Sequence, residues 1–288
     1  MPTRHIAFYG KGGGLASTVA ANVGAALAED SHRVIVVGCD PQNACTSVLH
    51  DKEEIVTVLE ALRLKDRVAL EDIAANGFND VLCIEAMSSY RSDVCAGRGI
   101  GEVFSFFRKT RLLDEYRPDV VIYDLPAEVV CGAFIFPAEN NFFDGAYVVS
   151  SADFISLSAA NNIFRTIRRN AERGGTKLGG IIAHGLTSAF AESIVKDFAE
   201  RTGTRVISHL PHSTAIIQSE LYGQTVLQAG PSSSHAFIYR RLAGKILDNG
   251  QMSIPNPFSG LELRRWAREW GDWLWEIEQG IIRNGESI

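Results

Sequence analysis

The chain has 288 residues, of which 46% are hydrophobic and 22% charged, so it can bury a large core. Its formal net charge of −6 argues against a nucleic-acid partner, because surfaces that bind nucleic acid are basic. It contains no apolar run of about 18 residues and no leader-like start, so we expect neither a membrane span nor a signal peptide. Its five scattered cysteines favour a reducing, cytoplasmic compartment.

Short runs rich in β-branched residues alternate with helix-like stretches along the chain. The runs are apolar without alternation, which is typical of strands that helices cover on both faces, and hence of a mostly parallel sheet in an α/β fold. The predicted strands span residues 4–10, 33–38, 119–124, 145–150, 178–184 and 205–210, with 81–86 as a weaker candidate. The predicted helices include residues 17–29, 100–113, 154–172, 189–202 and 236–248.

The sequence IPNPF, residues 254–258, marks the expected end of a single α/β domain over residues 1–258. Residues 259–288 form a tail that holds all four tryptophans of the chain. Apolar residues recur there every three to four positions, which predicts an amphipathic helix: Leu263, Trp266, Trp270, Trp273, Ile277 and Ile281. This helix either packs on its own subunit or a dimer mate, or serves as a docking helix for another protein.

The segment YGKGGGLAST, residues 9–18, is similar to the phosphate-binding loop of P-loop NTPases, whose pattern is G-x-x-x-x-G-K-[ST]. Gly10 begins the pattern and Ser17 ends it, but Leu15 and Ala16 replace its second glycine and its lysine. The lysine normally neutralises phosphate charge, so its loss favours either weakened nucleotide chemistry or a plain strand-to-helix turn. Residues that can still contact phosphate or magnesium are Gly10, Gly12, Gly13, Gly14, Ser17 and Thr18.

Two aspartates follow predicted strands at positions where a nucleotide site needs carboxylates. Asp40 follows the strand ending in VVGC, and Asp124 ends the strand VVIYD, the place of a Walker B aspartate that holds Mg²⁺ through water. Alone, either residue could simply cap a strand end. Together with the glycine-rich loop, they predict a switch-loop NTPase fold.

Cys95 and Cys131 each precede a glycine where a loop gives way to a helix. Two cysteines cannot complete a four-thiolate site, but two copies related by a twofold axis can. The spacing alone leaves open whether they hold a cluster or only pack. We assign Cys39, Cys45 and Cys83 to packing.

Taken together, these motifs resemble the iron protein of nitrogenase and its relatives in chlorophyll and nickel-tetrapyrrole biosynthesis. The resemblance covers almost the whole chain up to residue 258 and is carried by IAFYGKGG, VIVVGCDP, CAGRG, VVIYDLPAEVVCGAF, AANNI, KLGGII and IPNP. It implies that Cys95 and Cys131 are ligands of a [4Fe–4S] cluster shared by a homodimer. It also implies that Arg98 contacts a nitrogenase-like catalytic partner, and that Lys11 is the signature lysine of the deviant-Walker subclass, which reaches the other subunit's nucleotide.

The departures from the family pattern gather at the nucleotide site. The family's GKGGIGKST reads GKGGGLAST in this chain, and Ala44 and Glu128 stand at the positions of the family's two switch aspartates. Pro126 enters the second switch, and His184 replaces an asparagine that contacts adenine. In the family's VPRDN loop, His212 and Ser213 replace the charged pair.

Three functions therefore remain open. The first is a [4Fe–4S] electron-transfer protein, acting as a homodimer or as a mixed dimer with a conventional iron protein, with ATP hydrolysis impaired or lost. The second is a non-catalytic pseudo-NTPase that carries or senses a cluster or scaffolds an assembly. The third is an active ATPase in which Lys11 and Glu128 act in place of the lost residues, with bound ATP and Mg²⁺.

Overall fold

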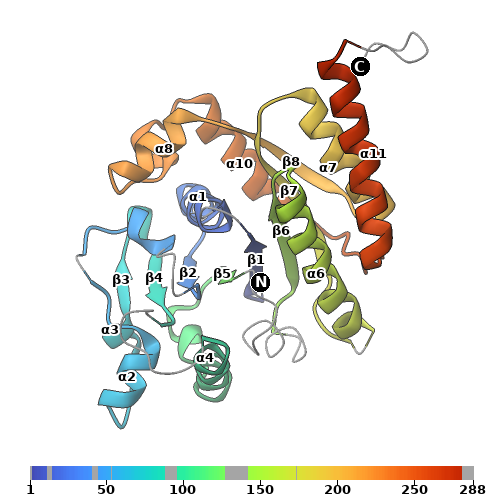
Figure 1. Ribbon diagram of the computed structural model, residues 1–288. Helices are drawn as coiled ribbons and strands as arrows, with labels where there is room; N and C mark the ends of the chain where they lie inside the picture. The colour runs from blue at the N-terminus through green and yellow to red at the C-terminus, as the bar shows by residue number, and fades with distance from the viewer. Residues whose placement is uncertain are drawn as a thin grey trace.

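The computed structural model describes residues 2–11, 15–40, 45–52, 54–87, 96–126, 142–172 and 174–280 (Figure 1). Eight strands form one sheet in the order β3-β4-β2-β5-β1-β6-β7-β8, and every neighbouring pair is parallel except β3 with β4. The strands are β1 Arg4–Gly10, β2 Val34–Gly38, β3 Ala74–Asn76, β4 Leu82–Glu85, β5 Val120–Pro126, β6 Gly145–Ser150, β7 Leu178–Leu186 and β8 Val206–Pro211. The predicted α/β class with a mostly parallel sheet is confirmed.

Helices cover both faces of this sheet, and each face has its own hydrophobic cluster. On one face lie α1 Leu15–Glu29, α8 Thr214–Leu221, α9 Val226–Ala229 and α10 Ser234–Leu247. On the other lie α2 Val58–Leu64, α4 Ala96–Thr110, α6 Phe154–Ala171, α7 Ala189–Arg201 and α11 Gly260–Glu278. Successive residues of β1 alternate between the clusters, since side chains of a strand point to opposite faces.

The predicted strands all occur, with bounds shifted by at most two residues. The short edge strand β3 was not predicted, because its sequence AAN has no β-branched or aromatic residue. α4 begins at Ala96 rather than residue 100 and ends at Thr110, because Arg111 adopts a left-handed conformation with φ of 55°. The remaining short elements are α3 Leu70–Ile73 and three 3₁₀ helices, Cys45–Val48, Phe78–Asp80 and Leu112–Tyr116.

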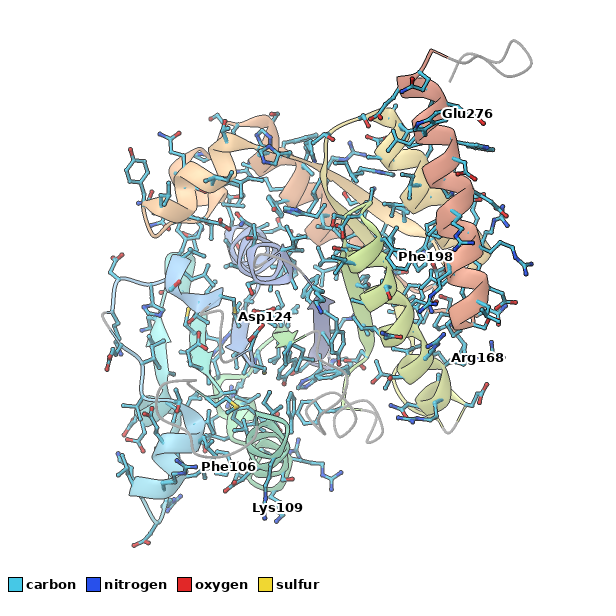
Figure 2. The ribbon with its side chains drawn as sticks, viewed as in Figure 1. Phe106, Lys109, Asp124, Arg168, Phe198 and Glu276 are labelled. Carbon is cyan, nitrogen blue, oxygen red and sulfur yellow. The ribbon has the colours of Figure 1, made fainter. Side chains whose placement is uncertain are left out.

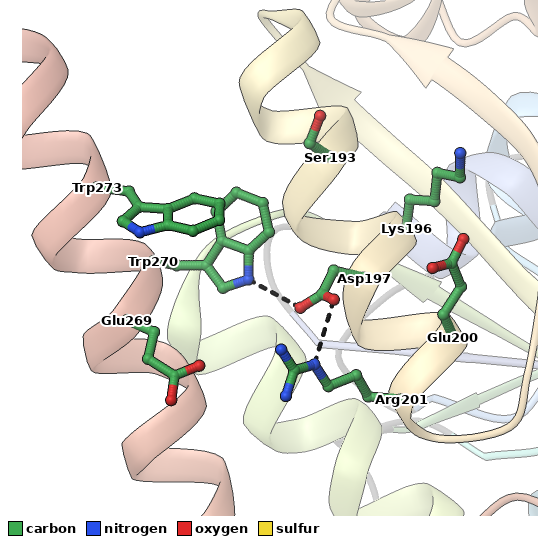
Figure 3. Close-up of a pocket in the computed structure, with 8 residues that line it drawn as sticks. All are labelled: Ser193, Lys196, Asp197, Glu200, Arg201, Glu269, Trp270 and Trp273. Carbon is green, nitrogen blue, oxygen red and sulfur yellow. Dashed lines mark hydrogen bonds and ion pairs between the residues drawn. The ribbon is translucent and has the colours of Figure 1, made fainter. Parts of the chain in front are cut away.

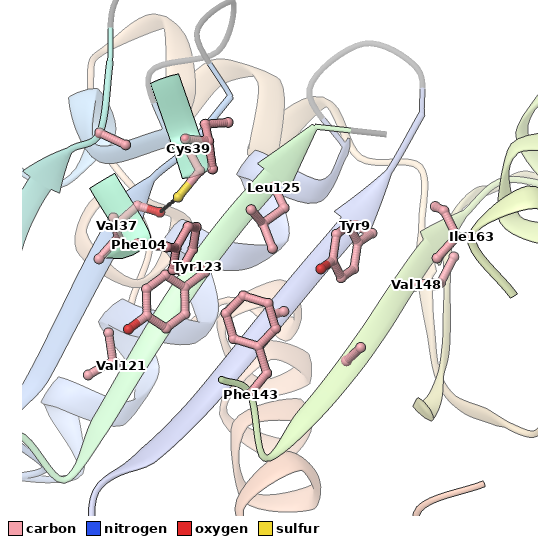
Figure 4. Close-up of a cluster of buried hydrophobic side chains, with 14 of the residues drawn as sticks. Tyr9, Val37, Cys39, Phe104, Val121, Tyr123, Leu125, Phe143, Val148 and Ile163 are labelled. Carbon is pink, nitrogen blue, oxygen red and sulfur yellow. Dashed lines mark hydrogen bonds between the residues drawn. The ribbon is translucent and has the colours of Figure 1, made fainter. Parts of the chain in front are cut away.

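Aromatic residues pack beneath the central strands and stiffen the sheet there (Figure 4). The Tyr123 ring centroid lies 5.1 Å from that of Phe143 and 5.4 Å from that of Phe104. Such tilted and edge-to-face pairs are the favoured aromatic geometries. The contact between Tyr123 and Phe104 holds β5 against α4, and therefore positions Asp124 near the carboxyl end of that strand.

The three cysteines assigned to packing are all buried and unpaired: Cys39, Cys45 and Cys83. Burial raises the pKa of the Cys83 thiol to about 12, so it stays protonated at neutral pH. These thiols therefore act as small apolar side chains.

The tail helix α11 begins with a capping box between Ser259 and Glu262 and lies against α7 at the outer edge of the molecule (Figure 1). The indole Nε1–H groups of Trp266 and Trp270 both donate to Asp197 Oδ2 of α7, at 2.6 and 3.0 Å. Its first half thus packs on its own subunit, one of the two alternatives predicted for the tail. Of the helices that the structure describes, none is long and apolar enough to cross a membrane.

Candidate functional site

The carboxyl ends of the parallel strands share one edge of the sheet, where the predicted site residues gather. β1 ends at Gly10, and α1 begins at Leu15, which gives the strand–loop–helix order of a phosphate-binding loop. A Cβ on Gly10 would lie 2.9 Å from the Val149 carbonyl oxygen and 3.1 Å from the Ala16 Cβ. Only glycine fits there. Gly12, Gly13 and Gly14 lie outside the described residues.

Ala16 occupies the lysine position and is buried in the cluster formed by α1, where it is only 5% exposed. A methyl group there supplies no positive charge to a bound phosphate. Lys11, by contrast, is exposed, and its carbonyl oxygen accepts a hydrogen bond from Ser156 Oγ of α6 at 3.4 Å. Lys11, the lysine that the resemblance implies is the signature residue, thus lies at the surface, and the position expected for the internal lysine holds a buried alanine.

Ser17 and Asp124 meet at the base of the loop, near the centre of the molecule (Figure 2). The Ser17 hydroxyl donates to Asp124 Oδ2 at 2.6 Å, and the carboxyl group is buried. The pKa of Asp124 is raised to about 7, chiefly by burial and also by the charge of Asp40, while hydrogen bonds from Ser17 and Cys45 act in the opposite direction. The pair that would hold Mg²⁺ is thus assembled around a carboxyl group whose burial favours the protonated form.

Glu85, which the sequence analysis missed, ends β4 beside the same site. Its carboxylate packs on the backbone of Gly38, where an added Cβ would lie 2.3 Å from Oε2, and it accepts a hydrogen bond from the Thr46 hydroxyl. The pKa of Glu85 is raised to about 7, chiefly by burial and also by the charges of Asp124 and Asp40, although the hydrogen bond from Thr46 lowers it. The one available signal was a charged residue at the end of the weak predicted strand 81–86.

Thr18, the second hydroxyl of the loop, points away from this pair. It donates to Glu220 of α8, 202 positions later in the sequence. Asn22, one turn further along α1, accepts from the Val226 amide at 2.9 Å. These hydrogen bonds hold the start of α1 against the α8–α9 segment, and the Thr18 hydroxyl does not join Ser17 at Asp124. The contact with Glu220 was not predicted from the sequence.

His184 lies near the carboxyl end of β7, buried with neither ring nitrogen hydrogen-bonded to another described residue. The pKa of His184 is lowered to about 4, chiefly by burial and in part by His212. The His212 amide donates to the Leu186 carbonyl at 3.2 Å, and Ser213 caps α8. The structure thus brings the substitutions at 184 and 212 into one neighbourhood, where His184 is a neutral imidazole at pH 7.

The structure describes only part of the region expected to hold an iron–sulfur cluster. Arg98 is exposed in the first turn of α4, which begins directly after Cys95. Ala44, Cys95, Glu128 and Cys131 lie outside the described residues. Among the residues that the structure does describe, no three His, Cys, Asp or Glu side chains are arranged to hold a metal ion.

Comparison with known proteins identifies relatives along nearly the whole chain. Residues 4–271 match the family described as "4Fe-4S iron sulfur cluster binding proteins, NifH/frxC family". The chain is 41% identical over 279 residues to nitrogenase iron protein 2 of Paenibacillus durus, covering 97% of this chain and 96% of that protein. It is 39% identical to nitrogenase iron protein 2 of Methanothermococcus thermolithotrophicus, covering 90% and 94% of the two chains.

Solved structures give the fold independently of sequence. The septum site-determining protein MinD of Pyrococcus horikoshii, solved with Mg-ADP, superposes with a TM-score of 0.68 over 86% of this chain and 97% of that one. The two sequences are only 21% identical, so this likeness concerns the fold alone. It confirms the P-loop NTPase-like architecture.

Proposed function

Because the chain belongs to the NifH/frxC family of 4Fe-4S iron–sulfur cluster binding proteins, we propose that it is an electron-transfer component acting on a nitrogenase-like partner, with its ATP hydrolysis impaired or lost. One observation carries the second half of this proposal. Ala16 is buried at the lysine position of the loop, while the Ser17–Asp124 pair beside it remains intact.

The proposed cluster ligands are Cys95 and Cys131 from each of two copies, in a homodimer or in a mixed dimer with a conventional iron protein. The start of α4 directly after Cys95 supports this assignment, since free backbone amides and the helix dipole at an N-terminus stabilise negative charge. When bound, a [4Fe–4S] cluster supplies a one-electron redox centre. The exposed side chain of Arg98 is then available to the catalytic partner.

ATP and Mg²⁺ remain possible ligands of the altered loop. Ser17 and Asp124 would hold the metal, and the backbone amides of the loop would contact phosphate. Removing one preorganised group that stabilises developing charge costs about 10²- to 10³-fold in rate. The alternative is that Lys11 and Glu128 compensate for this loss of rate. Steady phosphate release in an ATPase assay would support that alternative, and its absence would exclude it.

A second candidate function is a pseudo-NTPase that carries or senses a cluster without delivering electrons. The observation that favours it is the exposed second half of α11, which offers a surface for assembly. Oxidation of the reduced protein by a nitrogenase-like catalytic protein separates the two candidates, because only an electron carrier is reoxidised by it.

The cluster itself is tested by anaerobic purification with iron analysis and electron paramagnetic resonance of the reduced protein. We expect about two irons per chain, since one four-iron cluster would be shared by two copies. Cys95→Ala is expected to abolish both the iron and the signal, whereas the control Cys39→Ala, at a buried thiol in the core, should keep both. An iron-free wild-type protein contradicts the proposal.

A further inference from the structure

Two acidic side chains lie on one face of the sheet with Gly38 between them. β2 runs between β4 and β5, and its last residue, Gly38, is in register with Glu85 on one side and with Asp124 on the other. Residues in register on neighbouring parallel strands point to the same face of a sheet. An added Cβ on Gly38 would lie 2.7 Å from Glu85 Cδ. The Glu85 carboxylate therefore lies over β2, the strand that separates it from Asp124.

Two successive residues bond to these two carboxylates. Cys45 and Thr46 begin the 3₁₀ helix Cys45–Val48 and are only 3% and 1% exposed. The hydroxyl and the amide N–H of Thr46 both donate to Glu85. The Cys45 thiol donates to Asp124. Because consecutive residues are linked at a fixed spacing, the bonds that Thr46 makes also restrict where the thiol of Cys45 can lie.

We propose that Glu85 is a positioning residue for the Ser17–Asp124 end of the site, where a divalent cation would bind. By holding Thr46, it keeps the neighbouring Cys45 thiol in place. That thiol and the Ser17 hydroxyl both donate to Asp124, so two donors from different segments set the direction of its carboxylate. The effect on cation binding rests on the proposed function, whereas the hold on Cys45 does not.

Packing alone does not explain a carboxylate at this position. An apolar side chain of similar size would cover Gly38 without the cost of taking a carboxyl group out of water. The molecule uses a carboxylate to hold a segment elsewhere too, since Asp197 of α7 accepts hydrogen bonds from Trp270 of α11 and from Arg201 (Figure 3). Glu85 is thus expected to act through the hydrogen bonds that it accepts.

The far end of the same 3₁₀ helix is held independently of Glu85. The Phe78 amide donates to the Leu49 carbonyl at 2.7 Å, and the Leu49 amide donates to the Thr46 carbonyl at 2.8 Å. These bonds join backbone groups only. Loss of the Glu85 contact should therefore release the start of the helix, where Cys45 lies, without releasing its end.

Alkylation of Cys45 in the anaerobically purified full-length protein tests this hold. In Thr46→Val, which lacks the hydroxyl, the alkylation rate of Cys45 should rise at least about tenfold, because loss of a buried hydrogen bond makes local opening easier. Thr46→Ser keeps the hydroxyl and should react like the wild type. Mass spectrometry locates the label, and Cys39, which packs on the other face of the sheet, is the internal reference. Equal Cys45 rates in wild type and Thr46→Val overturn the proposal.

Variants at Glu85 test whether the same bond is responsible. Glu85→Ala should raise the Cys45 rate as Thr46→Val does, and Glu85→Gln, which keeps an acceptor oxygen, should raise it less. Combining Glu85→Ala with Thr46→Val should add nothing to either change alone, because both remove one interaction. Fully additive effects would overturn the assignment, since they would show that the two residues act separately.

The effect on cation binding is measured in the variant Leu15→Gly/Ala16→Lys, which restores the loop pattern. The rise in melting temperature that about 5 mM MgATP gives this variant should be at least about halved by Thr46→Val and kept by Thr46→Ser. Thr166→Val, at a buried threonine of α6, is the control and should also keep it.

This rise compares each variant with and without ligand, so a change in stability alone does not account for its loss. An undiminished rise with Thr46→Val overturns the positioning role. No rise in the loop-restored variant itself would instead contradict the proposed nucleotide role of Ser17 and Asp124, and the alkylation rates then decide the hold on Cys45 independently.

Discussion

A buried imidazole without a hydrogen-bond partner, as at His184, is costly to a fold when it must carry a charge. Elsewhere along the same edge of the sheet, polar groups are paired, as Ser17 is with Asp124 and Thr46 is with Glu85. Because neither ring nitrogen of His184 is paired within the described residues, protonation there gains nothing to offset the loss of water. His184 is therefore one of the residues through which the stability of this fold depends on pH.

The contribution of His184 to the free energy of unfolding should fall as the pH falls from about 6.5 to about 4, while Asp124 and Glu85, with pKa values raised to about 7, act in the opposite sense in wild type and His184 variant alike. In this range His184 becomes protonated in the unfolded chain but stays neutral in the folded one, whose pKa is lowered to about 4. The loss reaches about 3 kcal/mol, since one unit of pKa corresponds to about 1.4 kcal/mol. Urea unfolding at pH 7.5, 6 and 5 should show a smaller loss for His184→Leu. The exposed His209→Leu on β8 is the control, and equal slopes for wild type and His184→Leu would contradict this account.

At the scale of elements, one carboxylate joins α7 to α11. Asp197 accepts hydrogen bonds from Trp266, Trp270 and Arg201. Burial by itself would raise the pKa of Asp197, but these hydrogen bonds outweigh it and hold the pKa below its usual value. The charged acceptor is thus maintained where two indole N–H groups need it, and the first half of the tail helix is fixed to the body of the protein (Figure 2, beside Phe198).

Asp197→Ala should destabilise the protein by about 2 kcal/mol, because the buried Trp266 N–H loses its partner. Asp197→Asn keeps an acceptor oxygen and should cost about half as much. The measurement is urea unfolding followed by tryptophan emission, which shifts to longer wavelength when α11 leaves α7. Glu200→Ala, at an exposed position of α7, is the control and should change little. An Asp197→Ala variant as stable as the wild type would show that the indoles do not depend on this residue.

At the scale of the whole molecule, two hydrophobic clusters, one on each face, pack the sheet against its helices. A ligand that binds only the folded state raises its stability according to its concentration and dissociation constant. The loop of this chain lacks its internal lysine, so nucleotide should add little to the stability of the whole protein.

Thermal unfolding with about 5 mM MgATP should raise the wild-type melting temperature by less than about 1 °C. The melting temperature of the loop-restoring variant Leu15→Gly/Ala16→Lys should rise by about 3–5 °C, since binding worth about 2–3 kcal/mol moves a domain of this size by that amount. Phosphate release should remain negligible even then, because Ala44 and Glu128 still occupy the switch positions. A large shift with steady phosphate release in the wild type would instead support an active ATPase.

Local sequence features were sufficient to predict much of this architecture. Buried β-branched runs predicted β1, β5 and β6 because burial on both faces leaves a clear apolar signature. Contacts between distant segments, such as Thr18 with Glu220 or Glu85 with Gly38, had no local signal, since tertiary packing alone brings them together. The substitution at Ala16 was visible in the motif, whereas its burial could only come from the structure.

Helix α6 makes contact with both the loop and the start of the tail. Near its N-terminus Ser156 bonds the Lys11 carbonyl, and one and a half turns later Asn161 donates to and accepts from the Phe258 backbone, at 3.0 and 2.9 Å. Its 18 residues span about 27 Å, and Arg168 near its far end bonds Asn256. The helix thus connects the loop after β1 with the segment before α11, two parts of the protein that are far apart in the sequence. Because the same helix is bonded to both segments, we expect a displacement of α6 at Lys11 to shift the start of α11 as well.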